Sequence, residues 1–471
     1  MSQSTVSKKR NYEIDMCNGP ILSKILLFSL PLMLSSVLQL LFNAADIIVV
    51  GRFAGDDSLA AVGSTTSLVN LLTNLFIGLS IGANVLTARC YGAGRKRDLR
   101  ETVHTAMTLS LISGLLLAVI GVFGAGKILV LMQTPDEVVG LATVYLRILF
   151  LGMPAMMIYN FGSAILRAVG DTKRPLYFLA AAGVVNVLLN LFFVIVLKMN
   201  VAGVATATAL SQCLSAGLVI WCLTHERRGL RLYLNKLGIH KDKLKRIMEI
   251  GIPAGMQGML FSLSNVVIQS SINTFGNVVV AGNSAASNIE GFVYVAMNSF
   301  YQAAITFMSQ NLGAGRYERL GKITSRAVIC VLVTGLVGGN LAYFFGPQLL
   351  GLYSNSAAVI EAGMVRLSYI AVTYALCGLM DTMVGALRGL GYSVIPTVAS
   401  LIGACGLRIV WIMIVFPIPQ FHTIEMIYIS YPATWIITNI AHITVYIYAM
   451  KKLKPFIQKR KEQLALEREA A

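Results

Sequence analysis

The tetrapeptide Gly92-Ala93-Gly94-Arg95 recurs 221 residues later as Gly313-Ala314-Gly315-Arg316, and each copy follows a long apolar stretch. A longer pair keeps the same spacing, since SAILRAVG at 163–170 corresponds to VGALRGLG at 384–391. Self-similarity at half the chain length is typical of a duplicated membrane bundle, in which the binding site lies where the repeats meet.

Composition supports a membrane protein. The chain has 471 residues, of which 56% are hydrophobic and only 13% are charged. In a soluble domain roughly a quarter of the residues are charged. Several apolar stretches are long enough to cross about 30 Å of hydrocarbon as helices. The sequence predicts twelve spans, at 25–50, 58–88, 102–126, 138–166, 175–197, 203–224, 247–274, 280–309, 323–346, 357–387, 394–416 and 424–449.

The net charge of +17 is distributed unevenly along the chain. If both termini are cytoplasmic, the inner segments hold 32 of the 38 Lys and Arg residues, and the outer loops hold only Arg52, Lys127 and Lys198. This is the asymmetry that the positive-inside rule describes. We therefore expect a multi-pass protein of the plasma membrane, with cytoplasmic termini and the lipid bilayer rather than nucleic acid as its partner.

The spans divide into two halves. Six spans in each half give both halves the same orientation, so we expect an all-α membrane protein with two pseudo-symmetric six-helix lobes. The predicted parts are a cytoplasmic N-terminal tail, an N-lobe, a basic cytoplasmic linker, a C-lobe and a cytoplasmic C-terminal tail, at 1–24, 25–226, 227–246, 247–450 and 451–471.

The first span carries a polar stripe. Gln39, Asn43 and Asp46 are spaced by four and three residues, which places them on one helix face. An ionisable group within a span is costly and is a functional candidate by default. A lone polar residue is more often an interhelical hydrogen bond, but a stripe that ends in a carboxylate favours a hydrated interior. The corresponding position in the second half, near Ile268, is apolar.

Further oxygen-bearing side chains lie in the same half. Asn186 and Asn190 share a face of the fifth span, Thr208 lies in the sixth and Asn160 in the fourth. Together with Asp46 they suit Na⁺, or a protonatable carboxyl with hydrogen-bond partners. Each amide alone is more often a contact between packed helices.

The second half carries different ionisable groups. Glu290, Asp381 and Arg408 lie in the eighth, tenth and eleventh spans. We expect Arg408 to pair with Asp381 or Glu290, because an isolated guanidinium is expensive in a membrane. A structural ion pair and a role in transport are both open. The sequence has no GxxxxGK[ST] and no HExxH motif, so we expect neither an enzyme nor a bound cofactor or structural metal.

The sequence resembles the multidrug and toxic compound extrusion (MATE) antiporters over roughly residues 20–450. The resemblance rests on the doubled Gly-Ala-Gly-Arg motif, NAAD at 43–46, LRAVGDTKRP at 166–175, NVLLN at 186–190 and ALRG at 386–389. It implies twelve helices in two lobes around a central cleft, and exchange of an organic cation for H⁺ or Na⁺.

Within that family, the DNA-damage-inducible-type subgroup is the most similar. Asp46 matches its first-helix acid and Asn186 its fifth-helix asparagine, with Thr208 and Asn160 as less specific matches. The subgroup often has an aspartate one turn after that asparagine, where this chain has Asn190. Another subgroup binds Na⁺ with a seventh-helix glutamate, which this chain lacks.

These observations predict a monomeric antiporter that exports organic, cationic and amphipathic compounds, with Asp46 as the coupling residue. The single carboxylate favours H⁺ over Na⁺. The alternative is a flippase for a lipid-linked precursor with the same architecture. Such a flippase would need a cationic cleft for phosphates, and basic residues within the spans are sparse.

Overall fold

The computed structural model describes residues 12–132, 134, 136–226 and 229–469, and these form a helical bundle. The parts of the predicted tails and linker at 1–11, 227–228 and 470–471 lie outside the described residues. The helices of the first half are α1 (Ile21–Phe53), α2 (Asp56–Gly92), α3 (Lys96–Leu131), α4 (Asp136–Leu151), α5 (Met153–Ala168), α6 (Lys173–Leu191) and α7 (Asn200–Thr224).

The second half repeats this order. Its helices are α8 (Lys241–Asn273), α9 (Asn277–Gly313), α10 (Tyr317–Phe344), the short α11 (Gly346–Gly351), α12 (Ala357–Tyr369), α13 (Ala375–Leu390), α14 (Val394–Ser400), α15 (Leu407–Ile414) and α16 (Ile424–Glu469). A π-helical segment follows α6 at Phe192–Val196, and another joins α14 to α15 at Leu401–Gly406.

The twelve predicted spans all correspond to helices or to broken helices. Nine described helices are long and apolar enough to cross a membrane, and α4 with α5 forms a further span bent by 45° at a break. The other two spans are α9 and the broken pair α12–α13. In the repeat of the second half, α9 corresponds to α2 and α12–α13 corresponds to α4–α5. Helices α12 and α13, with 13 and 16 residues, are each too short to cross the membrane alone.

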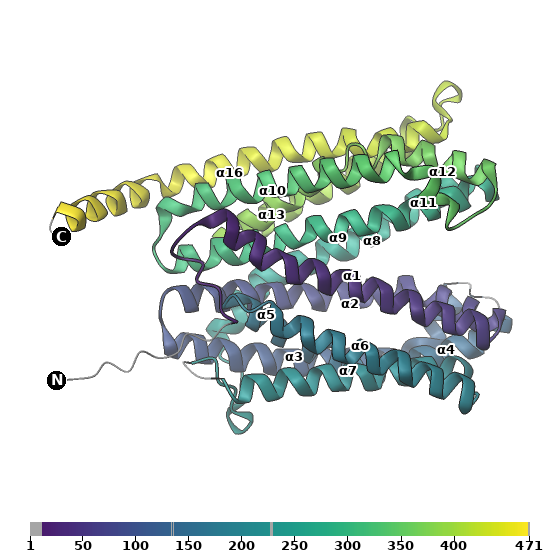
Figure 1. Ribbon diagram of the computed structural model, residues 1–471, viewed down its shortest axis with the longest axis horizontal. Coiled ribbons are helices and arrows are strands. Elements are labelled where there is room, and N and C mark those ends of the chain that lie inside the picture. The colour runs from purple at the N-terminus through teal and green to yellow at the C-terminus, as the bar shows by residue number, and fades with distance from the viewer. Residues whose placement is uncertain (1–11, 133, 135, 227–228, 470–471) are drawn as a thin grey trace.

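The helices form two layers, with α2–α7 in one and α8–α16 in the other, and both described ends of the chain lie at the same end of the bundle (Figure 1). Helix α1 runs obliquely between the layers, and its first half packs against the second lobe through Ile25, Phe28 and Leu32. This confirms the predicted all-α fold with two six-helix lobes. Apolar side chains such as Leu131 and Phe344 are 84% and 74% exposed on the outside of the bundle. In a bilayer they contact lipid, where exposure of apolar area carries no cost.

The doubled Gly-Ala-Gly-Arg motif joins the lobes. Gly94 and Gly315 adopt φ of +68° and +67° in equivalent turns, a conformation that favours glycine. A Cβ on Gly92 would lie 2.1 Å from the Gln310 carbonyl oxygen, and a Cβ on Gly313 would lie 2.1 Å from that of Arg89. The first glycine of each motif therefore allows α2 and α9 to pack backbone to backbone, at the end of the bundle that carries the termini.

Residues 12–20 of the predicted N-terminal tail pack against both lobes. The Ile14 amide donates to the Gly170 carbonyl in the N-lobe, and the Asn311 side chain in the C-lobe donates to the Met16 carbonyl at 3.1 Å. The Met16 side chain is fully buried. This segment adds to the contact between the lobes at the same end of the bundle.

Candidate functional site

A polar cavity lies in each of the two lobes. The N-lobe cavity has a volume of about 240 Å³ and includes Asp46 among its lining residues. The C-lobe cavity has a volume of about 430 Å³ and includes Glu290, Asp381 and Arg408. The candidate residues from the sequence thus separate into two sites.

A chain of hydrogen bonds connects Asp46 to α6 and α7. The Asn190 amide nitrogen donates to Asp46 Oδ1 at 2.5 Å and lies 3.3 Å from Asn186 Oδ1. The Asn186 amide nitrogen lies 3.4 Å from Thr208 Oγ1. The spacing of four residues places Asn186 and Asn190 on the same face of α6, as the sequence predicts. Both side chains are buried, so their amide groups are held in place.

Two buried acceptors beside this chain have no hydrogen-bond partner among the described residues. They are Asn190 Oδ1 and Gln212 Oε1, and Gln212 lines the cavity. A buried polar atom without a partner costs free energy. The N-lobe site therefore has spare acceptors for a proton donor or a cation.

The remaining N-lobe candidates line the cavity without contacting Asp46. Gln39 and Asn43 extend the polar face of α1 and are exposed. Asn160 donates to the Met156 backbone carbonyl at 2.9 Å within its own helix. Asn298 and Gln302 reach the cavity from α9 in the other lobe, so the N-lobe cavity borders the junction of the two lobes.

The basic residue that lines the N-lobe cavity is Arg167, which lies far from Asp46. Arg167 lies in the last turn of α5, just before α6 begins at Lys173, whereas Asn190, which contacts Asp46, lies near the other end of α6. At 1.5 Å per residue the distance from Lys173 to Asn190 along the helix is roughly 25 Å. Asp46 is therefore a carboxylate that accepts from the Asn190 amide, without a cationic partner among the described residues.

The C-lobe acids have different partners. Glu290 forms a bidentate pair with Arg366, with nitrogen to oxygen distances of 2.7 and 3.1 Å. Arg366 also donates to Asn283 at 2.7 Å. A planar guanidinium matches a carboxylate in this geometry, so Glu290 belongs to a satisfied buried ion pair.

The predicted pairing of Arg408 with Asp381 or Glu290 is wrong. Arg366 from α12 forms the ion pair with Glu290. Arg408 instead donates to Thr434 at 3.0 Å, and its guanidinium stacks on the Tyr431 ring at 3.9 Å from the ring centroid. Among the described residues Arg408 has no carboxylate within ion-pair distance. Asp381 interacts with the Tyr294 hydroxyl.

Sequence reasoning did not assign Gln212 and Arg366, which line these cavities, or the partners of the buried Arg388 of α13. Arg366 is one of the basic residues within a predicted span and could have been found on that ground. Gln212 lies on the same face of α7 as Thr208, four residues later. Arg388, from the second copy of the repeated LR-containing segment, donates to Gln257 at 2.7 Å and to Tyr301 at 2.5 Å, and no local signal predicts those partners.

Comparison with known proteins gives consistent results. The MatE family profile matches residues 31–192 and again residues 253–414. The chain is 29% identical over 439 residues to the probable multidrug resistance protein YoeA of Bacillus subtilis, covering 90% of this chain and 93% of that protein. It is also 29% identical over 400 residues to the probable multidrug resistance protein YpnP of the same organism, covering 84% and 88% of the two chains.

Solved structures share the fold. An outward-facing multidrug resistance MATE family transporter superposes with a TM-score of 0.86 at 22% identity, covering 96% of this chain and all of that one. A MATE structure in complex with MaL6 superposes with a TM-score of 0.85 at 22% identity, covering 94% and 98%. Since the profile matches most of the chain, in two copies that coincide with the two lobes, the chain belongs to the MATE family of membrane transporters.

Proposed function

We propose that this protein is an antiporter that exports organic cations in exchange for protons, and that Asp46 is the coupling residue. The observation that carries the proposal is the environment of Asp46. It is a carboxylate within a span, it lines a polar cavity, and among the described residues its hydrogen-bond partner is the Asn190 amide rather than a basic residue. Such a group can alternate between a proton and an organic cation as its positive partner.

The hydrogen-bond chain provides for both states of Asp46. When ionised, Asp46 accepts the Asn190 N–H and attracts a cation into the cavity. When protonated, the Asp46 carboxyl has a hydroxyl that can donate a hydrogen bond. Asn190 Oδ1 is buried and has no partner among the described residues, so a rotation of the Asn190 amide lets this oxygen accept from Asp46. Asn186 and Thr208 orient that amide, and Asn160 contributes to the cavity wall.

Na⁺ remains the alternative coupling ion. A Na⁺ site would combine Asp46 with the oxygens of Asn186, Asn190 and Thr208, which are hard ligands. Only one of these ligands, Asp46, carries a negative charge, which is little charge for a metal-ion site, whereas a proton needs only Asp46. This difference favours H⁺.

Proteoliposomes test the coupling ion. Vesicles that contain the purified protein and a fluorescent organic cation are given a pH gradient without Na⁺, and then a Na⁺ gradient at uniform pH. We expect efflux with the pH gradient alone. Efflux that follows the Na⁺ gradient after the pH gradient has collapsed would refute proton coupling.

The similarity to YoeA and YpnP, both probable multidrug resistance proteins, supports export of drugs. The N-lobe cavity also has apolar walls, with Phe42, Met156 and Tyr159 among its lining residues. A flexible thioether and two rings can adapt to varied apolar bodies. We therefore propose cationic, amphipathic small molecules as substrates. The flippase alternative is less well supported, because Asp46 would repel a phosphate.

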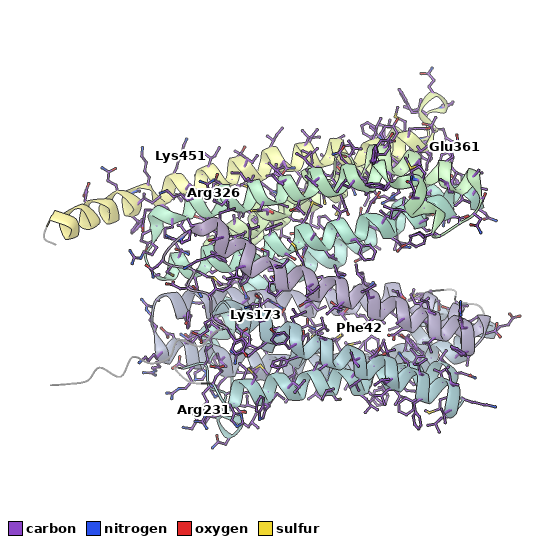
Figure 2. All side chains as sticks on the ribbon, in the orientation of Figure 1. Phe42, Lys173, Arg231, Arg326, Glu361 and Lys451 are labelled. Atoms are coloured by element: carbon purple, nitrogen blue, oxygen red, sulfur yellow. The ribbon has the colours of Figure 1, made fainter. Side chains whose placement is uncertain are left out.

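We propose that the end of the bundle that carries the termini faces the cytoplasm of a plasma-membrane monomer, with the tails and linker bounded as predicted. Arg231, Arg326 and Lys451 lie towards that end, and Glu361 lies at the opposite end (Figure 2). Lys236→Cys, in a chain with the exposed Cys213 replaced by serine, tests this orientation. An impermeant thiol reagent should label it only after permeabilisation, and labelling of sealed cells would refute the topology.

A further inference from the structure

The C-lobe cavity contains two guanidinium groups but only one carboxylate that pairs with either. Arg366 is neutralised by Glu290. Arg408 is only 6% exposed and lies close enough to Arg366 to experience its charge. Both guanidinium groups contact the Tyr431 ring, at 3.9 Å for Arg408 and 5.8 Å for Arg366. The cluster therefore carries an excess positive charge in a buried site.

The hydrogen-bonding capacity of Arg408 is mostly unused. A guanidinium has five N–H donors in a planar fork, and the bond to Thr434 uses one of them. Its Nε is buried and has no partner among the described residues, and Arg408 lines the cavity. A buried guanidinium with free donors is matched by a carboxylate, which accepts two parallel hydrogen bonds.

A row of aromatic rings connects Arg408 to the second carboxylate of the cavity. The ring centroids of Tyr431 and Trp435 are 5.8 Å apart, those of Trp435 and Tyr374 are 5.8 Å apart, and those of Tyr374 and Tyr294 are 6.5 Å apart. Tyr294 in turn interacts with Asp381. The wall of the cavity thus runs from a guanidinium, across four rings, to a carboxylate.

We infer that the C-lobe cavity is a binding site for aromatic zwitterions, in which Arg408 binds the ligand carboxylate, the row of rings contacts its aromatic body and Asp381 accepts its amine. The charges of Arg408 and Asp381 complement both ends of such a ligand. A simple organic cation would face the excess charge of Arg408, and a simple anion would face Asp381. The inference goes beyond the cation exchange proposed for the N-lobe and does not depend on the coupling ion.

Calorimetry tests this site with three probes that share one skeleton, on the purified full-length protein in detergent carrying Asp46→Asn, which removes the charge that attracts cations to the N-lobe cavity. They are 4′-(aminomethyl)biphenyl-4-carboxylate, its methyl ester, which is a cation, and its N-acetyl derivative, which is an anion. We expect the zwitterion to bind at least about tenfold more tightly than either derivative, because each derivative loses one charged hydrogen-bond partner. Failure of the zwitterion to bind, or tighter binding of the ester, would overturn the inference.

Variants locate the contacts. Arg408→Gln should weaken binding of the zwitterion and of the anion by about tenfold or more, and it should not weaken the ester, because it removes a charge that repels the cation. Arg408→Lys, which keeps the charge, should retain the preference for the carboxylate, and Asp381→Asn should weaken the zwitterion and the ester but not the anion. Arg147→Gln, which removes an exposed arginine of the N-lobe, is the matched control.

Thermal unfolding of each variant separates loss of the site from loss of the fold. If Arg408→Gln does not fold, the Asp381→Asn protein provides the test on its own. It must bind the ester more weakly than the unsubstituted site does, while its affinity for the anion is not weakened. Wild-type affinity for the zwitterion in a folded Arg408→Gln or Asp381→Asn protein would contradict the assignment.

Discussion

The two cavities occupy corresponding places in the repeat but carry opposite chemistry. The family profile matches the two halves 222 residues apart, and at that spacing Asn186 corresponds to Arg408. Each lines the cavity of its lobe, and each lies within hydrogen-bond distance of a threonine, Thr208 or Thr434. Conversely, Asp46 corresponds to a position near Ile268, an apolar residue of the C-lobe wall.

This comparison indicates which features duplication has retained. The close contacts at Gly92 and Gly313 are symmetric, because any side chain there would separate α2 from α9. Asp46 and Arg408 have no oppositely charged partner among the described residues and line the cavities of their lobes, so these two charges can change with little effect on the framework. We infer that the lobes share a framework and divide the binding tasks between them.

The strongest test of the comparison is removal of the N-lobe carboxylate. Asp46→Asn keeps the shape of the side chain and removes the charge that proton exchange requires. We expect drug export in a pump-deficient host to fall to the level of cells without the transporter, with normal amounts of folded protein. Asp57→Asn, the same change at an exposed position, should export normally. Wild-type export by Asp46→Asn would eliminate the difference between the lobes.

The C-lobe pair provides the opposite case, in which the charge stabilises the fold. Arg366→Gln leaves Glu290 buried without its partner, which typically costs about 3–5 kcal/mol. We expect a large decrease in the unfolding temperature measured by scanning fluorimetry. The double variant Glu290→Gln with Arg366→Gln should recover much of the lost unfolding temperature, because it leaves no unpaired charge at this site. If the double variant is no more stable than Arg366→Gln, Glu290 and Arg366 do not act as a pair.

Adding a second N-lobe carboxylate sharpens the choice of ion. Asn190→Asp places a second acid beside Asp46, so two neighbouring carboxyls titrate as a coupled pair. With proton coupling, the pH optimum of efflux should shift, as measured across a pH series in proteoliposomes. With Na⁺ coupling, the same variant should instead bind Na⁺ more tightly, and that result with an unchanged pH optimum would contradict our assignment. Asn160→Asp, in the same cavity without contact to Asp46, is the control.

The smallest effect is expected at the cavity mouth. Gln39 and Asn43 are exposed on α1, so replacing either by alanine should raise the KM for an organic cation only about two- to fivefold, as the loss of a solvated polar contact would. Efflux kinetics at several substrate concentrations measure this change. A complete loss of transport in Gln39→Ala, with the protein folded, would show that Asp46 does not act alone.

Much of this architecture could be predicted from sequence, because long apolar stretches and basic loops report directly on a bilayer. The helical spacing also placed Asn186 and Asn190 on one face and Asp46 on a polar stripe. The contact between Asp46 and Asn190 could not be derived, since it depends on how α1 rotates against α6.

The partners of the C-lobe charges were less predictable. Arg366 and Arg408 both line the cavity that contains Glu290, and spacing within one helix cannot decide between them. Arg366 also donates to Asn283, which lies on α9 seven residues before Glu290, so one guanidinium serves two polar groups of the same helix. The π-helical segment at Leu401–Gly406 further rotates Arg408 relative to a regular helix, and no residue pattern marks that change.

The central claim is that Asp46 exchanges a proton for an organic cation. A measurement of proton flux tests this claim most directly. The purified protein is reconstituted in Na⁺-free vesicles with a trapped pH indicator, and a gradient of an organic cation is imposed. We predict that the wild-type protein moves protons against the direction of the cation, and that Asp46→Asn moves none. Cation-driven proton movement in Asp46→Asn equal to that of the wild type, or its absence in the wild type, would contradict the account.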